Sequence, residues 1–238
     1  MGHGINMLKE KNKSDEILLL GILSLFCLGL SIFRAVYTQT KMFLFLNWNL
    51  FLAFIPWCLT TLSVIKPGIK SRKIGILFLL FFWLLFFPNA PYILTDLFHL
   101  RLRTSMPIWF DVILILSFAW TGLLFGFLSL WDIENIFSEK IQRKYVTLLA
   151  ALVLFIGSFG IYLGRYLRWN SWDIIREPVL LFRDITDRVA DPFSYPGAWG
   201  MTVLWGVFLN MMYWSIRLLG RKNRTARQPA KEFIPKKP

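Results

Sequence analysis

Histidine is nearly absent from this 238-residue sequence, which contains only His3 and His99. Cysteine is equally scarce: Cys27 and Cys58 are the only two, and each lies inside an apolar run without the spacing of metal ligands. We therefore expect two buried free thiols rather than a disulfide. Charged residues make up 17% of the chain, whereas soluble domains usually contain about 25%. This low share argues against a soluble protein.

The signatures of common soluble enzymes are also missing. The chain has no G-x-S-x-G elbow, Walker loop, dinucleotide fingerprint, H-E-x-x-H or C-x-x-C motif. A serine nucleophile is not favoured, although Ser105 and Ser171 lie close enough to the polar motifs described below to leave it open.

Long apolar runs dominate what is present. Hydrophobic residues make up 56% of the chain and gather into runs that can cross a bilayer, which takes roughly 20 residues as a helix. We predict an all-α fold, a polytopic transmembrane helical bundle of about six spans, with short interfacial helices in the outer loops. A polar tail (1–16) precedes the six-span membrane domain (17–219), and a basic tail (220–238) follows it. The predicted spans are 17–37, 42–65, 74–87, 108–131, 145–166 and 199–219.

Glycine pairs spaced four residues apart occur in two of these spans, as Gly122 with Gly126 and Gly160 with Gly164. Small residues at this spacing let helices approach closely. We expect general packing at these positions rather than a specific dimer face.

The distribution of positive charge predicts the orientation. Six spans place both termini on one side, and that side holds twice as many of the 27 Lys and Arg residues as the other. The positive-inside rule then puts both termini in the cytoplasm. The basic C-terminal tail suits attraction to anionic cytoplasmic lipids. It has no base-reading element, so we expect no specific nucleic-acid binding.

The outer side keeps an unusual set of charges. All basic residues of its third and fifth loops are arginine, and several carboxylates stand near them. Arginine grips carboxylates or phosphates with two parallel hydrogen bonds. Under this topology ten polar residues lie at the same depth, near the outer membrane interface: Asn47, Asn49, Asn89, Asp96, His99, Asp111, Arg165, Arg168, Asn170 and Asp173.

The first candidate site lies in the stretch 86–111, FFPNAPYILTDLFHLRLRTSMPIWFD. If residues 92–103 form a helix, Thr95, Asp96, His99 and Arg103 share one stripe. Asp96 could then orient His99 as a general base or acid, and we assign these two residues as catalytic. The same pair could supply two metal ligands, but the spacing is unspecific, so we assign no metal and leave the cofactor open. In the structural alternative, Asp96 caps a helix and His99 extends its polar tip into water.

The second candidate site is YLGRYLRWNSWDII, at 162–175. If its helix continues past the membrane surface, Ser158, Tyr162, Arg165, Trp169 and Trp172 share one face. The alternative is an aromatic belt with snorkelling arginines. The two arginines of this stretch need a partner, which would be Asp96, Asp111, Asp173 or a bound anion. We assign substrate binding to Asn89, Arg165, Arg168, Asn170 and Asp173.

The two motifs together also resemble a known family. PNAPYILTDLFHL followed by a WFD-start span, and later GIYLGRYLRWNSWDII, are similar to a family of bacterial integral membrane proteins, the domain of unknown function thirteen sixty-one. The likeness runs from the second span to the last. It implies a bacterial membrane setting and singles out the two motifs, but it implies no reaction.

Two functions remain open from the sequence. The first is an enzyme acting at the outer leaflet on a lipid or lipid-linked substrate, with arginines holding an anionic head group. The second is a non-enzymatic accessory, assembly or transport component, in which the polar cluster is a structural ion-pair network. Transport is less favoured, because few ionisable groups lie near the middle of the membrane.

Overall fold

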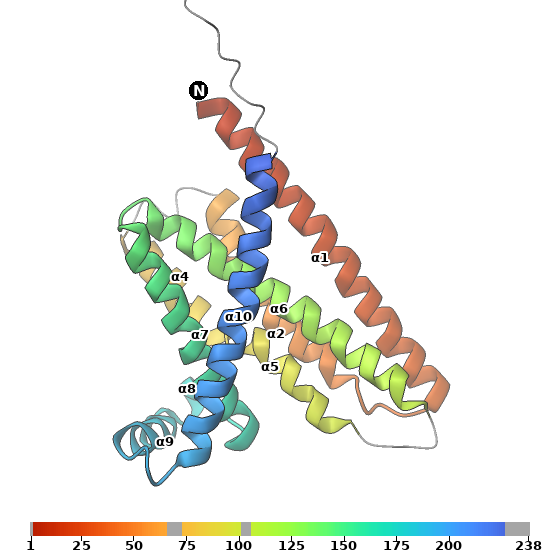
Figure 1. Cartoon of the computed structure of the whole chain (residues 1–238). Coiled ribbons are helices and arrows are strands. Elements are labelled where there is room, and N and C mark those ends of the chain that lie inside the picture. The colour runs from red at the N-terminus through yellow and green to blue at the C-terminus, as the bar shows by residue number, and fades with distance from the viewer. Residues whose placement is uncertain (1, 66–72, 101–105, 227–238) are drawn as a thin grey trace, which may run out of the picture.

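The computed structural model describes residues 2–65, 73–100 and 106–226, and these form a helical bundle (Figure 1). Six helical segments are long and apolar enough to cross a membrane, which confirms the predicted fold class. Five are single helices: α1 (Gly2–Thr38), α2 (Phe45–Ile65), α6 (Ile108–Ser138), α7 (Arg143–Tyr166) and α10 (Pro196–Ala226). We call the end of the bundle that holds Thr38, His99 and Tyr166 the distal end, and the opposite end the termini end.

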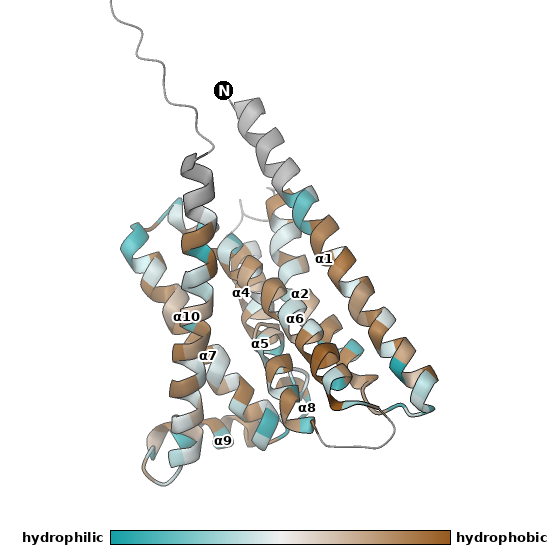
Figure 2. Ribbon diagram, turned by 45° about the vertical axis from the view of Figure 1, so that its right-hand side comes forward, coloured by the Kyte–Doolittle hydropathy of each residue, from teal (hydrophilic) through white to brown (hydrophobic). Residues whose placement is uncertain are grey.

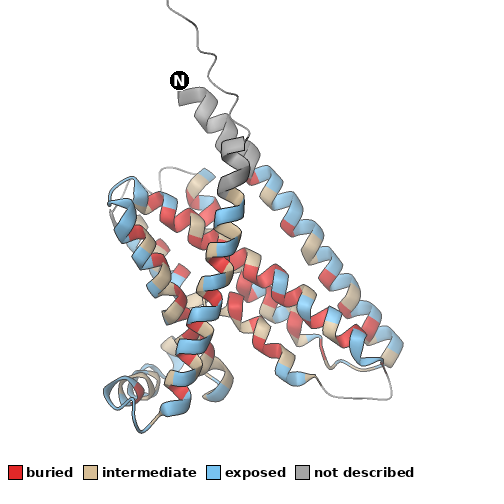
Figure 3. Cartoon of the chain, in the orientation of Figure 1, coloured by how far each residue is buried: buried red, intermediate tan, exposed pale blue. Residues whose placement is uncertain are grey.

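The central element is α6, which packs against α1, α2, α7 and the third segment. Buried residues make up 61% of its most apolar window, against 17% in α1 and in α10. The outer faces of α1 and α10 remain exposed, although their residues are largely apolar (Figures 2 and 3). A helix that is apolar on its outside needs lipid around it.

The third segment is a broken helix. It consists of α4 (Lys73–Phe86), α5 (Asn89–Tyr92) and a 3₁₀ helix, η1 (Ile93–His99). Pro88 and Pro91 lack the backbone N–H that a continuous helix needs. With 14 residues, α4 alone spans about 21 Å and cannot cross a hydrocarbon core of about 30 Å. The apolar stretch therefore continues to His99, beyond the predicted end of the span at Phe87.

The predicted glycine pairs explain how the break is accommodated. A Cβ added to Gly126 of α6 would lie 2.8 Å from the Cβ of Ala90, and one added to Gly160 of α7 would lie 2.8 Å from Pro88. Gly122 and Gly164 face Ile93 and Tyr92 in the same way. Both glycine faces therefore pack against one short segment, α5 with the start of η1, and hold it between α6 and α7.

Several helix boundaries differ from the prediction. α1 begins at Gly2 and so includes the predicted polar tail, whereas α10 continues to Ala226 into the predicted basic tail. α6 extends to Ser138, seven residues past the predicted end of its span at 131. In each case the helix continues for several residues beyond its apolar part. Hydropathy shows where a helix leaves the membrane, but it does not show where the helix ends. Residues 227–238 lie outside the described ranges.

Ion pairs at both ends of α6 attach its neighbours. Arg34 of α1 forms two bonds with Asp111, from Nε at 2.6 Å and from Nη2 at 3.0 Å. At the termini end, Lys13 of α1 lies 2.7 Å from Asp132. Arg217 of α10 there binds Glu134 of α6, with 2.5 Å between Nη1 and Oε1. Cys27 and Cys58 are free thiols, as predicted, but only Cys27 is fully buried and Cys58 is partly exposed.

Two short helices, α8 (Asp173–Arg176) and α9 (Pro178–Ala190), lie at the distal end (Figure 1). The polar side of α9 faces the bundle: Trp169 donates to Asp184, and Trp199 donates to the Arg188 carbonyl, both at 2.8 Å. These bonds hold the long connection between α7 and α10 against the distal end of the bundle.

Candidate functional site

Asp96 is the most deeply buried charged group at the distal end, with 1% of its surface exposed. Its Oδ1 accepts from Arg165 Nη2 at 2.6 Å, and its Oδ2 accepts from Asn49 Nδ2 at 2.9 Å. Three elements that are distant in sequence, α2, η1 and α7, therefore meet at one carboxylate. The alternative in which Asp96 caps a helix is wrong, because η1 starts after Tyr92 and has no side-chain cap.

Arg165, in the last turn of α7, is held by protein groups on every side. Its Nε and Nη2 donate to Thr95 Oγ1 at 2.9 and 2.6 Å, and its guanidinium lies 4.6 Å from the centre of the Tyr92 ring. Thr95 in turn donates its hydroxyl to the Tyr92 carbonyl at 2.7 Å, which leaves the lone pairs of Oγ1 for the arginine. Gly164, next to Arg165, makes room for the Tyr92 ring.

The 3₁₀ geometry of η1 sets the spacing of the site. Side chains three residues apart eclipse one another in such a helix, so Asp96 and His99 project from the same side. The predicted α-helix over 92–103 is therefore wrong in type, although it placed these two residues correctly on one face. Arg103, the fourth member of the predicted stripe, lies outside the described residues.

His99 stands at the mouth of this cluster with 48% of its side chain exposed. Its Nδ1 lies 3.8 Å from Asp96 Oδ1, too far for a hydrogen bond, and 3.4 Å from Arg165 Nη1. The ring also packs on Phe45 of α2, with 5.4 Å between centroids. The expected direct hydrogen bond between Asp96 and His99 does not form, because the arginine reaches both residues.

Both close partners of the His99 ring lie at Nδ1: Arg165 Nη1 at 3.4 Å and Asp96 Oδ1 at 3.8 Å. Neither distance fixes which ring nitrogen carries the proton. Nε2 is left for a ligand, so the site presents one imidazole nitrogen above a buried ion pair.

The other predicted binding residues lie elsewhere at the distal end. Asn89 donates to the Phe86 carbonyl and to Ser171 Oγ, both at 3.0 Å, and so links the broken helix to the segment after α7. Asp173 accepts from the Asn170 backbone N–H at 2.7 Å within a local turn. No contact within the described ranges joins these residues to Asp96, so their binding role stays a prediction.

Arg168 is part of the helix end rather than of the cluster. α7 ends at Tyr166, so the predicted continuation that placed Trp169 and Trp172 on its face is wrong. Arg168 has a φ of 61°, and the Trp169 N–H donates to the Leu163 carbonyl at 3.1 Å, the arrangement that closes many helices. Arg168 itself is exposed, and within the described part of the chain its guanidinium has no ion pair.

A family comparison covers most of this geometry. The family model described as "Protein of unknown function (DUF1361)" matches residues 48–212. The chain belongs to this family. The matched region contains Asn49, Asp96, His99 and Arg165, the side chains that meet at the distal end. No curated protein and no solved structure matches the chain.

Sequence reasoning missed part of what the structure builds at this site. Tyr92 and Phe45 had no role in the predicted site, and Asn49 was placed only by depth. Asp111, predicted as a partner for Arg165 or Arg168, binds Arg34 instead. The signal available was the placement of Arg34, the only arginine in the first and second predicted spans and the loop between them, at the end of the first span. Among the described residues, no three His, Cys, Asp or Glu side chains gather as a metal site.

Proposed function

We propose that this chain is a bacterial cytoplasmic-membrane protein that acts on a lipid or lipid-linked substrate with an anionic head group, at the extracytoplasmic face. One observation carries the proposal: the half-exposed His99 ring sits on a buried Asp96–Arg165 pair at the distal end. Buried ion pairs are costly, and polar groups at this depth usually have a function. A pair that only held helices together would not need a histidine at its mouth.

The proposed chemistry uses Nε2 of His99. Nε2 takes the proton of an acceptor hydroxyl as the hydroxyl oxygen bonds to the acyl or phosphoryl group of the lipid, and the ring then returns this proton to the oxygen that leaves. Asp96 and Arg165 act as positioning residues: Arg165 contacts the Nδ1 side of the ring, and Asp96 compensates the arginine charge. Arg165 is already engaged by Thr95 and Asp96, so its contribution to head-group binding is its charge rather than a free donor.

A His99→Gln variant tests this proposal. Glutamine can donate a hydrogen bond from a position close to Nε2 but cannot act as an acid or base at neutral pH. The full chain is reconstituted in vesicles of total bacterial membrane lipid extract, and lipid species are followed over time by mass spectrometry. We expect wild type to convert one lipid class, His99→Gln to lose this conversion at least 100-fold, and Arg183→Gln, an exposed change at the same end, to retain it. Conversion by His99→Gln at the wild-type rate refutes the acid–base role.

The orientation has its own test. On a background in which Cys27 and Cys58 are alanine, Ser194→Cys marks the distal end and Lys140→Cys marks the termini end; both positions are exposed. We expect a membrane-impermeant maleimide to label Ser194→Cys in intact cells and Lys140→Cys only after permeabilisation. The reverse pattern overturns the extracytoplasmic assignment.

A non-enzymatic accessory is the second candidate, and the contacts of Arg165 within the protein favour it. Its guanidinium makes its hydrogen bonds with Thr95, Asp96 and His99, as a structural clamp would. This role predicts that His99→Gln complements a deletion strain fully, whereas Arg165→Met does not. The proposed enzyme predicts that both variants fail.

A further inference from the structure

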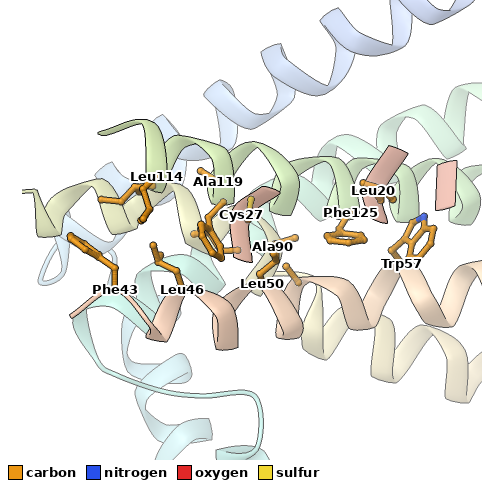
Figure 4. Close-up of a cluster of buried hydrophobic side chains, with 14 of the residues drawn as sticks. Leu20, Cys27, Phe43, Leu46, Leu50, Trp57, Ala90, Leu114, Ala119 and Phe125 are labelled. Carbon is orange, nitrogen blue, oxygen red and sulfur yellow. The ribbon is translucent and has the colours of Figure 1, made fainter. Parts of the chain in front are cut away.

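A groove of about 470 Å³ runs between α1 and α2, with Phe125 of α6 at its floor. Its lining is apolar apart from Ser24 and Asn47. Both walls belong to segments that are long and apolar enough to cross a membrane, so the open side of the groove faces hydrocarbon when the bundle spans a bilayer. Figure 4 shows Leu20, Trp57 and Phe125 around its deep end.

The length of the groove matches one leaflet. Asn47, near the distal end of α2, and Trp57 mark its two extremes along that helix. Ten residues of helix rise about 15 Å, which is half of a hydrocarbon core about 30 Å thick. A single chain from the distal leaflet would therefore fill the groove from the interface to the middle of the membrane.

The α1 wall leaves this space open. Gly21 of α1 lines the groove, and a Cβ added there would have no atom within 4 Å. Glycine weakens a helix interior, and no close neighbour requires it at this position.

We propose that this groove holds one acyl chain of a membrane glycerophospholipid, with the head group at the Asn47 end. A polyprenyl chain is much longer than one leaflet and fits the groove length less well. This inference goes beyond the proposed function. Asn47, which lines the groove, and Asn49, which binds Asp96, are two residues apart and so project from opposite faces of α2. The bound lipid therefore places its head group at the depth of the site but across α2 from it.

Photo-crosslinking tests the groove directly. The full chain is reconstituted in phosphatidylcholine vesicles that contain a trace of phosphatidylcholine with a diazirine on its acyl chain, and crosslinked residues are mapped by mass spectrometry. We expect crosslinks to concentrate on Ser24, Phe51 and Phe54. Equal density on Leu25 and Phe208, which are exposed outside the groove, would show only surrounding lipid and overturn the proposal.

A matched pair of glycine variants sharpens the result. Gly21→Leu fills the groove, whereas Gly29→Leu enters open space on the same helix but outside the groove. We expect Gly21→Leu to reduce the groove crosslinks at least fivefold and Gly29→Leu to leave them unchanged. Unchanged crosslinks in Gly21→Leu overturn the proposal. Should Gly21→Leu not fold, Ser24→Leu fills the same space and is judged by the same criterion.

The crosslinking result does not depend on turnover. If Gly21→Leu removes the crosslinks while the wild type converts no lipid, the groove is confirmed and the proposed reaction fails. If the wild type converts lipid and Gly21→Leu leaves the crosslinks unchanged, the reaction stands and the groove proposal fails.

Discussion

Buried ion pairs lie at both ends of the bundle, but they connect different kinds of elements. Lys13–Asp132 and Arg217–Glu134 at the termini end join continuous helices, as does the pair of Arg34 with Asp111 at the distal end. The pair of Asp96 with Arg165 instead joins α7 to a 3₁₀ helix that follows a break. The first three pairs attach α1 and α10 to α6, whereas the fourth positions a half-exposed histidine.

This difference shows what the broken helix adds. A continuous α-helix would carry these polar residues out of the membrane, with each side chain rotated by about 100° from the one before it. The break at Pro88 and Pro91 and the glycine faces of α6 and α7 hold η1 against the bundle instead. Thr95 and Asp96 are then buried while His99 stays at the surface. Four predictions test the contrast between pairs that attach helices and the pair that positions a side chain.

The largest effect is expected from removing the cation of a buried pair. Arg34→Met leaves Asp111 buried and unpaired, and Arg165→Met does the same to Asp96, so each should lower the free energy of unfolding by about 3–5 kcal/mol. Unfolding in mixed micelles, followed by tryptophan fluorescence, measures both. A loss below about 1 kcal/mol for Arg165→Met would mean that the distal network does not stabilise the fold.

A smaller effect is expected from the glycine faces. Gly126→Ala places a Cβ 2.8 Å from Ala90, so we expect a loss of about 1–3 kcal/mol as α5 is displaced. Gly29→Ala meets nothing within 4 Å and should gain about 0.5–1 kcal/mol from helix propensity. The same unfolding assay compares the two variants. Equal changes in both would show that α6 does not hold the break in place.

The residue that ends α7 should respond in the opposite direction. Arg168 adopts a left-handed conformation with a φ of 61°, so Arg168→Gly should raise the free energy of unfolding by about 1 kcal/mol. Arg183→Gly, inside α9, should lower it by about 1 kcal/mol. If Arg168→Gly is more stable than wild type yet no longer converts lipid, the predicted binding role of this guanidinium gains support. If Arg168→Gly converts lipid at the wild-type rate, the guanidinium has no binding role.

The smallest change in stability is expected at the residue with the largest proposed role. His99 is half-exposed, so His99→Gln should alter the free energy of unfolding by less than about 0.5 kcal/mol. A large loss of stability in the unfolding assay would show that His99 itself stabilises the fold. The pair of Asp96 with Arg165 would then not differ in kind from the three pairs that attach helices.

The sequence by itself determined the class of fold. Apolar runs of membrane length establish six spans, because hydropathy depends on local composition alone. Local spacing also placed Asp96 and His99 on one face, since side chains three residues apart align in both an α-helix and a 3₁₀ helix. It named Arg165 and Arg168 as charges in need of partners, and listed Asp96 among the candidates.

Only the tertiary structure decided which partners meet. Arg165 had Asp96, Asp111 and Asp173 as candidates, and the packing of α5 between Gly126 and Gly160 selected Asp96. The packing of α1 on α6 gave Asp111 to Arg34, while Asp96 stays out of hydrogen-bonding reach of His99. The physical reason is range: hydropathy and helical spacing act over a few residues, whereas an ion pair joins segments about 70 residues apart, and contacts at that separation depend on how the helices pack.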